Sequence, residues 1–406
     1  MLINCHTYYS YKYGTISIED LIKEAQKKAY NYLVLTDINN TSASIDFVRQ
    51  CMVRQIKPIL GVDFRNGAQQ KYIGIAKNNK GFRELNEHLT SHLHASEDFD
   101  NRSPVFKHVY IIYPFKDFKF RKLRKNEFVG IRPSELNKLR FSEWRNNMDK
   151  LLILHPVSFR SKRDFNIHRL LRAIDNNTLL SKLPKSEEAQ SDEIMLSESE
   201  LTSIFHNYPR IIENTKQLID NCTIQFAYNG FKNKKSFTGS VEEDFDLLKK
   251  EAGKGIKYRY KNPTKEVTKR MNKELKIIRE MNFCSYFLIN WDLVKYAQRQ
   301  GVHYVGRGSG ATSMVAYLLR ITDVDPIELD LYFERFINLY RSSAPDFDLD
   351  FSWRDREDVT RFIFNEFKHV SLLGTYNTFQ QRGVLREIGK VFGLPQEEIK
   401  RIQDGR

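Results

Sequence analysis

The chain has 406 residues, of which 65 are Lys or Arg and 51 are Asp or Glu, so its formal net charge at pH 7 is +14. Hydrophobic residues make up 41% and aromatic residues 13%, which is enough for two or three folded domains and excludes a disordered chain. The sequence has no apolar run near the ~20 residues that cross a bilayer and no signal-peptide pattern, and its four cysteines are widely spaced. We therefore expect a cytoplasmic protein without a membrane span. The positive net charge favours a polyanionic partner.

The first two hundred residues alternate short apolar strands with amphipathic helices. Ser17 is predicted to cap a helix with an apolar stripe of Ile18, Leu21, Ile22, Ala25 and Ala29, and a second helix is expected to bury Ile45, Val48 and Met52. Strands are predicted at 32–36, 58–64, 72–76, 109–113 and 151–154. This alternation favours a parallel sheet closed or covered by helices. Because active groups in such folds follow the strands, Asp37 and Asp63 are the first candidates.

Residues from about 170 to 222 are predicted to be helical, with a capping box at Ser197 and Glu200. The polar stretch 229–240 is typical of a loop or a domain boundary. Residues 231–300 contain 17 Lys or Arg and nine Asp or Glu, a net charge of +8. A basic run is usually a solvated helix face. This one leads directly into a glycine-rich loop, which favours a surface that binds a phosphate backbone.

The glycine-rich loop comprises residues 306–313 (GRGSGATS) and precedes a predicted helix at 314–320. Glycines permit a tight turn with converging backbone N–H groups, and a helix start adds partial positive charge, so together they form an anion site. Arg307 adds a cation suited to phosphate. Taken alone, a glycine-rich loop is a weak signal, and the alternative interpretation is an ordinary tight connection.

An acidic segment follows at 345–351 (PDFDLDF), and its strict alternation predicts a strand. In a strand Asp346 and Asp348 share one face, while Phe347, Leu349 and Phe351 pack behind it. Two adjacent carboxylates suit Mg²⁺, and two ions ~4 Å apart activate a 3′-hydroxyl and stabilise a leaving pyrophosphate. The alternative is an exposed edge strand with solvated carboxylates. A Gly-Ser loop followed by such a strand favours a nucleotidyltransferase.

The stretch GRGSGATSMVAYLLRITDVDPIELDLYFERFIN, followed by PDFDLDF, resembles the palm of the alpha subunit of bacterial DNA polymerase III, a C-family replicative polymerase. Three earlier blocks, NCHTYYSYKYGTISIEDLIKEA, LTDINN and KPILGVDF, are similar to the polymerase-and-histidinol-phosphatase (PHP) domain that begins those subunits. The resemblance implies an α/β fold with three parts. A distorted β/α barrel of PHP type would span residues 1–228. Residues 229–300 would form a linker, a basic helical thumb and the start of the palm. Residues 301–406 would form a partial palm like that of polymerase beta.

The resemblance also implies roles for individual residues. Asp346 and Asp348 would be the catalytic aspartates that bind two Mg²⁺ ions, Gly308 and Ser309 would hold the triphosphate, and Arg335 would contact the nucleotide. Arg307 joins the phosphate-binding set because of its place in the loop. The partners would be primer–template DNA and dNTPs, and, for the full-length protein, the sliding clamp and the proofreading subunit. The family has a third catalytic aspartate further downstream, so we expect residues 1–406 to have little or no polymerase activity.

The metal site of the PHP part departs from the family pattern. Where active members have H-x-H and Thr-Asp-His, this chain has His6-Thr7-Tyr8 and Thr36-Asp37-Ile38. Where they have Gly-x-Glu and a later Asp-x-His, it has Gly61-Val62-Asp63 and Pro156-Val157-Ser158. We therefore expect no zinc there. A weak single-metal site of His6, Asp37 and Asp63 stays open, but hydrogen-bonded residues at strand ends are the favoured interpretation. The alternative functions are a PHP phosphoesterase or 3′–5′ exonuclease and a non-catalytic nucleic-acid-binding scaffold.

Overall fold

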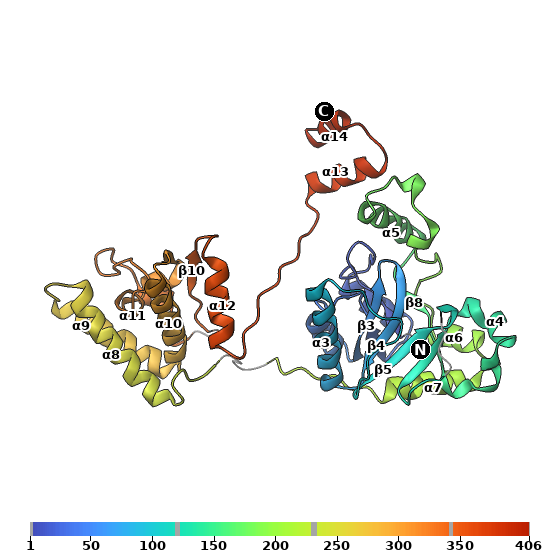
Figure 1. The fold of residues 1–406 in the computed structure, drawn as a ribbon, viewed down its shortest axis with the longest axis horizontal. Helices are drawn as coiled ribbons and strands as arrows, with labels where there is room; N and C mark the ends of the chain where they lie inside the picture. Colours follow the sequence, from blue (N-terminus) through green and yellow to red (C-terminus); the bar gives the residue numbers. More distant parts are fainter. Residues whose placement is uncertain (1–2, 118–121, 229–233, 341–343, 406) are drawn as a thin grey trace. The chain divides into compact units, whose positions relative to one another are not determined.

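A computed structural model of the protein describes residues 3–117, 122–228, 234–340 and 344–405 (Figure 1). The chain divides into two compact units: Met1–Ala227 together with Asn377–Arg406 form the first, and Tyr228–Tyr376 form the second. Among the described residues, no helix combines the length and the apolar character needed to cross a membrane.

The first unit is built on an eight-stranded sheet of order β7-β6-β5-β4-β3-β2-β1-β8. All five predicted strands form, and the complete set is β1 (Asn4–Cys5), β2 (Tyr32–Leu35), β3 (Lys57–Asn66), β4 (Gln69–Ala76), β5 (Val109–Pro114), β6 (Glu127–Ile131), β7 (Leu151–Ile153) and β8 (Pro156–Val157). β4 is antiparallel to β3 and β5, and the other neighbouring pairs are parallel. The expectation of a parallel sheet was therefore wrong for β4. Only Gly67 and Ala68 join β3 to β4, too few residues for a crossover, and Gly67 has a φ of +58°.

The two edges of this sheet come together. Its edge strands, β7 and β8, are separated in the sequence only by Leu154 and His155. At the reach of an extended chain, Ile153 and Pro156 are at most about 11 Å apart. The sheet must therefore curl, which agrees with the distorted β/α barrel of the prediction. Its interior is apolar, with β2, β7 and β8 buried along their whole length.

Helix α1 (Ile18–Lys27) begins as predicted, because the Ser17 hydroxyl accepts a hydrogen bond from the backbone N–H of Asp20. Four of the five predicted apolar positions are buried, namely Ile18, Leu21, Ile22 and Ala25. The fifth, Ala29, lies beyond the helix in a left-handed conformation with φ of 58°. The stripe therefore ends one turn earlier than predicted.

Helix α2 (Ser44–Val53) buries Val48 as predicted, but its buried face is rotated away from Ile45 and Met52. Ile45 and Met52 are 46% and 53% exposed, and the buried residues are Ser44, Phe47, Val48 and Cys51. Those four follow helical spacing equally well. The face that carries Phe47 packs inward because an aromatic ring has the larger apolar surface to bury.

The segment predicted as helical between 170 and 222 is interrupted. It contains the end of α5 (Lys162–Asp175), then α6 (Glu198–Ile204) and α7 (Pro209–Asp220), while residues 176–197 contain only short 3₁₀ turns. Asn177 has a φ of 47°, which stops α5. The capping box of Ser197 and Glu200 begins α6 as predicted.

Further helices of this unit are α3 (Asn79–Ala95), α4 (Leu136–Arg140), α13 (Gln381–Val391) and α14 (Gln396–Gln403). Because α13 contacts α5, the last thirty residues group with the first unit.

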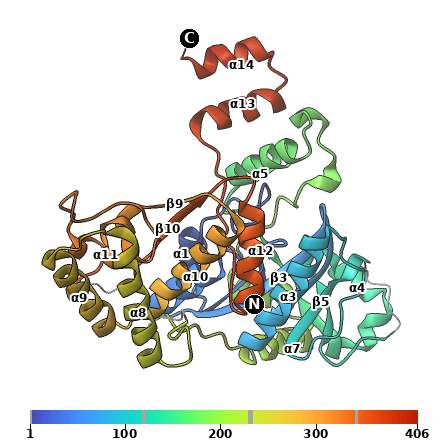
Figure 2. The same ribbon diagram turned by 60° about the vertical axis from the view of Figure 1, so that its left-hand side comes forward.

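The second unit is mainly helical, as expected for its first part. Its α-helices are α8 (Val241–Arg259), α9 (Lys265–Glu280), α10 (Cys284–Gln300), α11 (Met314–Leu318) and α12 (Arg356–Glu366). The strands β9 (Tyr304–Arg307) and β10 (Asp348–Phe351) form a two-stranded sheet (Figure 2). Two 3₁₀ helices, η7 (Gly308–Thr312) and η8 (Phe333–Arg335), carry predicted site residues. The core of this unit includes Leu248, Leu275, Phe287, Phe333 and Phe336.

Candidate active site

The glycine-rich loop lies directly against the acidic segment. Gly308 has a φ of +72°, a conformation that favours glycine. A Cβ atom on Gly308 would lie 2.4 Å from Oδ2 of Asp348, and one on Gly310 would lie 2.8 Å from the ring of Phe347. A side chain at Gly310 would therefore clash with the Phe347 ring, and one at Gly308 would displace the Asp348 carboxylate. The loop and the acidic residues, forty positions apart in the sequence, meet in the fold as predicted.

The acidic segment pairs antiparallel with the strand that precedes the loop. Asp348 lies opposite Arg307, and Asp350 lies opposite Val305. The strand is shorter than predicted, Asp348–Phe351 instead of 345–351, because its partner β9 ends at Arg307, where the chain turns into η7. Exposure nevertheless alternates from residue 346 to residue 351, with all three aspartates exposed. Phe347 packs behind them, 5.0 Å from both the Phe287 and the Phe336 ring.

Arg307 pairs with the aspartates rather than pointing away from them. Its Nε donates to Oδ2 of Asp350 at 2.5 Å, and its Nη1 lies 3.7 Å from Oδ2 of Asp348. This hydrogen bond to Asp350 raises the pKa of Arg307. The guanidinium thus balances negative charge on the exposed face of β10, next to the loop.

The start of α11 does not offer the predicted helix-end anion site. The carboxylate of Glu274, from α9, accepts hydrogen bonds from the backbone N–H groups of Met314 and Val315 at 3.0 and 3.1 Å. It also accepts one from the Ser313 hydroxyl at 2.8 Å. A side-chain carboxylate therefore already satisfies these donors. Any external phosphate would have to use the earlier part of the loop, around Gly308 and Ser309.

Arg335 lies at the end of η8, which contacts η7. Its side chain is exposed, whereas Phe333 and Phe336 anchor the short helix in the core. Its neighbour Glu334 accepts a hydrogen bond from Nζ of Lys273 at 2.5 Å. The fold therefore brings Arg335, Gly308, Ser309 and the acidic strand into one region of the second unit.

The acidic segment supplies the ligands that Mg²⁺ prefers. Asp346 and Asp348 are exposed carboxylates, and Mg²⁺ is commonly held by one or two carboxylates together with substrate phosphates. Across the described part of the chain, no cluster of three or more His, Cys, Asp or Glu residues could hold a metal ion. The pair therefore fits an ion that is completed by a bound phosphate or by a further ligand.

The polar residues at the strand ends of the first unit form a separate buried network. His6 Nε2 lies 3.0 Å from Oδ2 of Asp63, and its Nδ1 lies 2.9 Å from the Ser158 hydroxyl. Arg65 donates to the same Asp63 oxygen from Nε at 3.0 Å and from Nη2 at 2.7 Å. Burial favours the neutral form of Asp63, but Arg65 and His6 outweigh it and hold the pKa of Asp63 well below its ordinary value.

The carboxylate of Asp37 has different hydrogen-bond partners. It accepts hydrogen bonds from the backbone N–H and the hydroxyl of Thr7, at 2.6 and 2.8 Å, and from the hydroxyl of Ser10 at 2.7 Å. Burial raises the pKa of Asp37, and these hydrogen bonds oppose that rise only in part. Of the three residues considered for a weak metal site, His6 and Asp63 are hydrogen-bonded to each other, whereas Asp37 is hydrogen-bonded to Thr7 and Ser10.

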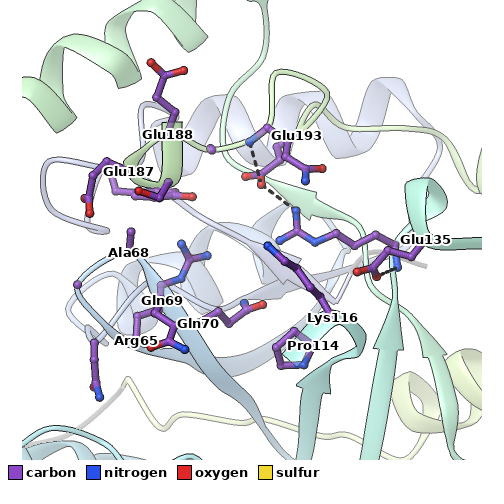
Figure 3. Close-up of a pocket in the computed structure, with 17 residues that line it drawn as sticks. Arg65, Ala68, Gln69, Gln70, Pro114, Lys116, Glu135, Glu187, Glu188 and Glu193 are labelled. Carbon is purple, nitrogen blue, oxygen red and sulfur yellow. Dashed lines mark hydrogen bonds and ion pairs between the residues drawn. The ribbon is translucent and has the colours of Figure 1, made fainter. Parts of the chain in front are cut away.

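A cavity of about 570 Å³ opens beside this network (Figure 3). Its lining includes Arg65, Lys116, Arg132 and Glu193. Arg132 Nη1 lies 3.2 Å from Oε1 of Glu193, and Ser158 donates to the other oxygen of Glu193 at 2.7 Å. The charged groups closest to Asp63 are therefore engaged with one another within the protein.

Two family models match the chain, one in each part of the sequence. The family model described as the bacterial DNA polymerase III alpha NTPase domain matches residues 246–405, and the PHP domain model matches residues 3–118. The DNA polymerase III subunit alpha of Borreliella burgdorferi is 27% identical over an aligned length of 468 residues, which covers 99% of this chain. Over nearly all of its own length, the chain resembles DNA polymerase III alpha subunits. It spans about two fifths of the length of these relatives, 40% in this case.

Two other relatives show the same coverage. The DNA polymerase III subunit alpha of Bacillus subtilis is 27% identical over 98% of this chain and 39% of its own length. A protein named error-prone DNA polymerase, from Symbiobacterium thermophilum, is 27% identical over 98% of this chain and 41% of its own length. The resemblance to DNA polymerase III alpha therefore includes both the PHP part and the polymerase part.

The sequence interpretation missed three charged residues that the structure brings to the PHP pocket, namely Arg65, Arg132 and Glu193. Arg65 could have been found, because it stands two positions after Asp63 and shares a strand face with it. Arg132 and Glu193 carry no such signal, since they are far from each other and from Asp63 in the sequence. Glu274 was missed for the same reason.

Proposed function

We propose that this chain is the N-terminal portion of a DNA-directed DNA polymerase of the DNA polymerase III alpha type. The complete enzyme would transfer a nucleotide from a dNTP to the 3′-hydroxyl of a primer during DNA replication. The proposal depends most on the contact of Gly308 with the carboxylate of Asp348, because a triphosphate held by the loop would then lie beside the acidic residues. The names of the relatives and the family model over residues 246–405 support the same function.

Each residue of the loop and the strand would have one task. Gly308 and Ser309 would hold the triphosphate through the backbone, because the absence of a side chain at Gly308 lets the loop lie against Asp348 and so beside the proposed metal site. Arg335 would contact the nucleotide from η8. Arg307 would bind phosphate after exchanging its carboxylate partner Asp350 for it, since both are oxyanions that suit a guanidinium.

Asp346 and Asp348 would hold two Mg²⁺ ions. When bound, such ions favour deprotonation of the primer hydroxyl and neutralise the charge that develops on pyrophosphate. The protein's own contribution is to place the carboxylates on the same exposed face as the loop and to fix them there through the packing of Phe347. Catalysis would therefore arise mainly from positioning and from charge stabilisation.

The wider organisation follows the same proposal. We divide the chain into a PHP domain at 1–228, a linker with a basic helical thumb and the start of the palm at 229–300, and a partial palm at 301–406. Primer–template DNA would bind the basic helices, and the sliding clamp and proofreading subunit would bind the full-length protein in the cytoplasm. We expect no zinc in the PHP pocket, because His6, Arg65 and Gln70 already engage one oxygen of Asp63.

Binding of a dNTP tests the proposed function directly. The Asp348→Asn variant keeps the shape of the side chain but removes one of the two expected metal-binding carboxylates. We expect its Mg²⁺-dependent affinity for a fluorescent dNTP, measured on residues 1–406, to fall about tenfold or more, because two charged ligands of a divalent ion become one. The matched control is Asp358→Asn, which removes an exposed aspartate from α12 of the same unit and should leave the affinity unchanged. Equal affinity in the wild type and Asp348→Asn would rule out this site.

A further inference from the structure

A buried carboxylate fastens the glycine-rich loop from behind. Glu274, on α9, is fully buried, and its two oxygens accept four hydrogen bonds. Three donors belong to the end of the loop and the start of α11: the hydroxyl of Ser313 and the N–H groups of Met314 and Val315. The fourth is Nε of Arg270, at 2.7 Å. All four contacts are shorter than 3.2 Å, which is within the range of good hydrogen bonds.

The same helix reaches the other parts of the site. One turn before Glu274, Nη2 of Arg270 donates to the backbone carbonyl of Leu331 at 2.8 Å, just ahead of η8. Lys273 pairs with Glu334, the residue next to Arg335. α9 therefore contacts both segments that carry predicted nucleotide-binding residues, the loop and η8.

We propose that Glu274 is a positioning residue for the nucleotide site: by accepting the first N–H groups of α11 and the Ser313 hydroxyl, it holds the loop of Gly308 and Ser309 against Asp348. The inference rests on the proposed function for its purpose, but the restraint itself is a property of the described contacts. Glu274 would touch neither nucleotide nor metal. It would act only through the loop.

The arrangement needs such a restraint. α11 has five residues, too few to be stable by helix propensity alone, and its first N–H groups have no partner within the helix. A carboxylate at that end satisfies the donors and interacts favourably with the helix dipole. Burial raises the pKa of Glu274, and the hydrogen bonds from Arg270 and α11 oppose that rise. Arg270 thus compensates a charge that would otherwise be costly to bury.

The restraint also defines where a phosphate can bind. Because Glu274 uses the N–H groups of Met314 and Val315, a triphosphate is left with the first residues of the loop, Gly308 and Ser309. Those residues lie next to Asp348, whereas the start of α11 faces the core. The buried acid therefore directs the ligand towards the acidic strand.

The test compares Glu274→Gln with Glu266→Gln, an exposed glutamate on the first turn of the same helix. In the Glu274→Gln variant, the new amide would keep one oxygen acceptor and present an NH₂ group to donors that need an acceptor. We expect hydrogen exchange at the Met314 and Val315 amides to become at least tenfold faster in this variant, while exchange in the core of α8 and α10 stays unchanged. We expect its Mg²⁺-dependent dNTP affinity to fall about tenfold while its affinity for duplex DNA is unchanged. Glu266→Gln should behave as the wild type.

The outcomes separate this inference from the proposed function. Unchanged exchange at Met314 and Val315 in a folded Glu274→Gln variant would overturn the inference, even if dNTP binds. Faster exchange with unchanged dNTP affinity would also overturn it, because the restraint would then have no bearing on the site. A wild-type chain that binds no dNTP with Mg²⁺ would defeat the proposed function and, with it, the positioning role. If Glu274→Gln does not fold, the second variant is Ser313→Ala. It removes one of the four hydrogen bonds to Glu274 and also the hydrogen bond that the Ser313 hydroxyl accepts from the N–H of Ala316. Exchange at Met314 and Val315 should rise and dNTP affinity should fall, each by at least threefold, and wild-type behaviour of that variant would overturn the inference.

Discussion

Arg65 places a fixed positive charge beside Asp63 in the PHP pocket. Both side chains are buried, at 5% and 0% exposure, and two nitrogens of the guanidinium contact one carboxylate oxygen. His6 and Gln70 contact the same oxygen. The Arg65 guanidinium therefore favours the ionised form of the buried Asp63 carboxylate.

Replacing Arg65 with Met should destabilise the first unit by about 3 kcal/mol, because it leaves a buried carboxylate without its main counter-charge. The measurement is urea unfolding at pH 7, followed by circular dichroism. Arg83→Met is the control, since Arg83 forms an exposed ion pair with Glu87 on α3 and its loss should leave the midpoint unchanged. An Arg65→Met variant as stable as the control would show that the pair makes no net contribution.

The same pair predicts a pH dependence. The folded state holds the pKa of Asp63 below its ordinary value, so the ionised form stabilises the fold above the unfolded-state pKa of about 4. That stabilisation should be lost as the pH falls from about 4 towards the lower pKa of the folded state. The acid-induced loss of unfolding free energy should be smaller in Arg65→Met, because its Asp63 pKa lies closer to the ordinary value. Parallel curves for the two proteins between pH 2 and 7 would contradict this assignment.

At the scale of elements, α8 and α9 combine two uses of positive charge. Arg259, Arg270 and Lys273 bind backbone carbonyls or acidic side chains within the second unit. Lys265 and Lys269 are exposed one turn apart on α9. The net charge of residues 231–300 therefore overstates the charge that is available to DNA, because part of it stabilises the fold.

Duplex DNA affinity of the chain should fall steeply with salt, because binding to phosphates releases counterions. Replacing Lys265 and Lys269 together by Gln should flatten the slope of log affinity against log salt, by about 0.9 for each phosphate that the variant no longer neutralises. Fluorescence anisotropy between 50 and 300 mM NaCl measures the slope. The matched control, Lys80→Gln with Arg83→Gln on α3, should retain the wild-type slope. Salt-independent binding by the wild type would refute the proposed role of the basic helices.

At the scale of the whole molecule, each unit has its own hydrophobic core. The first contains the curled sheet and the PHP pocket, and the second contains the loop, the acidic strand and α9. The residues proposed for nucleotide transfer all belong to the second unit. Of the three exposed aspartates there, the family resemblance implies a metal-binding role for Asp346 and Asp348 only, and a third catalytic aspartate further along the chain.

Residues 1–406 should therefore show no primer extension above background, although they should bind dNTP and DNA. The physical reason is that two carboxylates without the third catalytic aspartate do not hold both ions in a reactive arrangement. A primer-extension assay with labelled primer and Mg²⁺ measures this, and the Asp348→Asn variant sets the background. Robust synthesis by the wild type that is lost in Asp348→Asn would show that the two carboxylates suffice.

Local pattern alone identified much of this protein. Five strands, the caps of α1 and α6 and the alternation around Phe347 were predicted because each depends on neighbours a few residues away. The blocks around Gly308 and Asp348 were also sufficient to indicate the polymerase family. The buried face of α2 was misjudged, since two stripes of similar spacing compete there and packing against the sheet selects one.

Only the tertiary structure revealed the long-range polar contacts. Glu274 meets Met314 across forty residues, and Arg132 meets Glu193 across sixty-one. Nothing in the sequence near a buried acid states which donor it faces, because that partner is chosen by how the helices and strands pack. The antiparallel direction of β4 and the approach of β7 to β8 also depend on how the strands pack, so only the tertiary structure revealed them. Sequence determined most of the elements and the resemblance to DNA polymerase III alpha subunits, and packing determined which charges neutralise one another and which stay exposed.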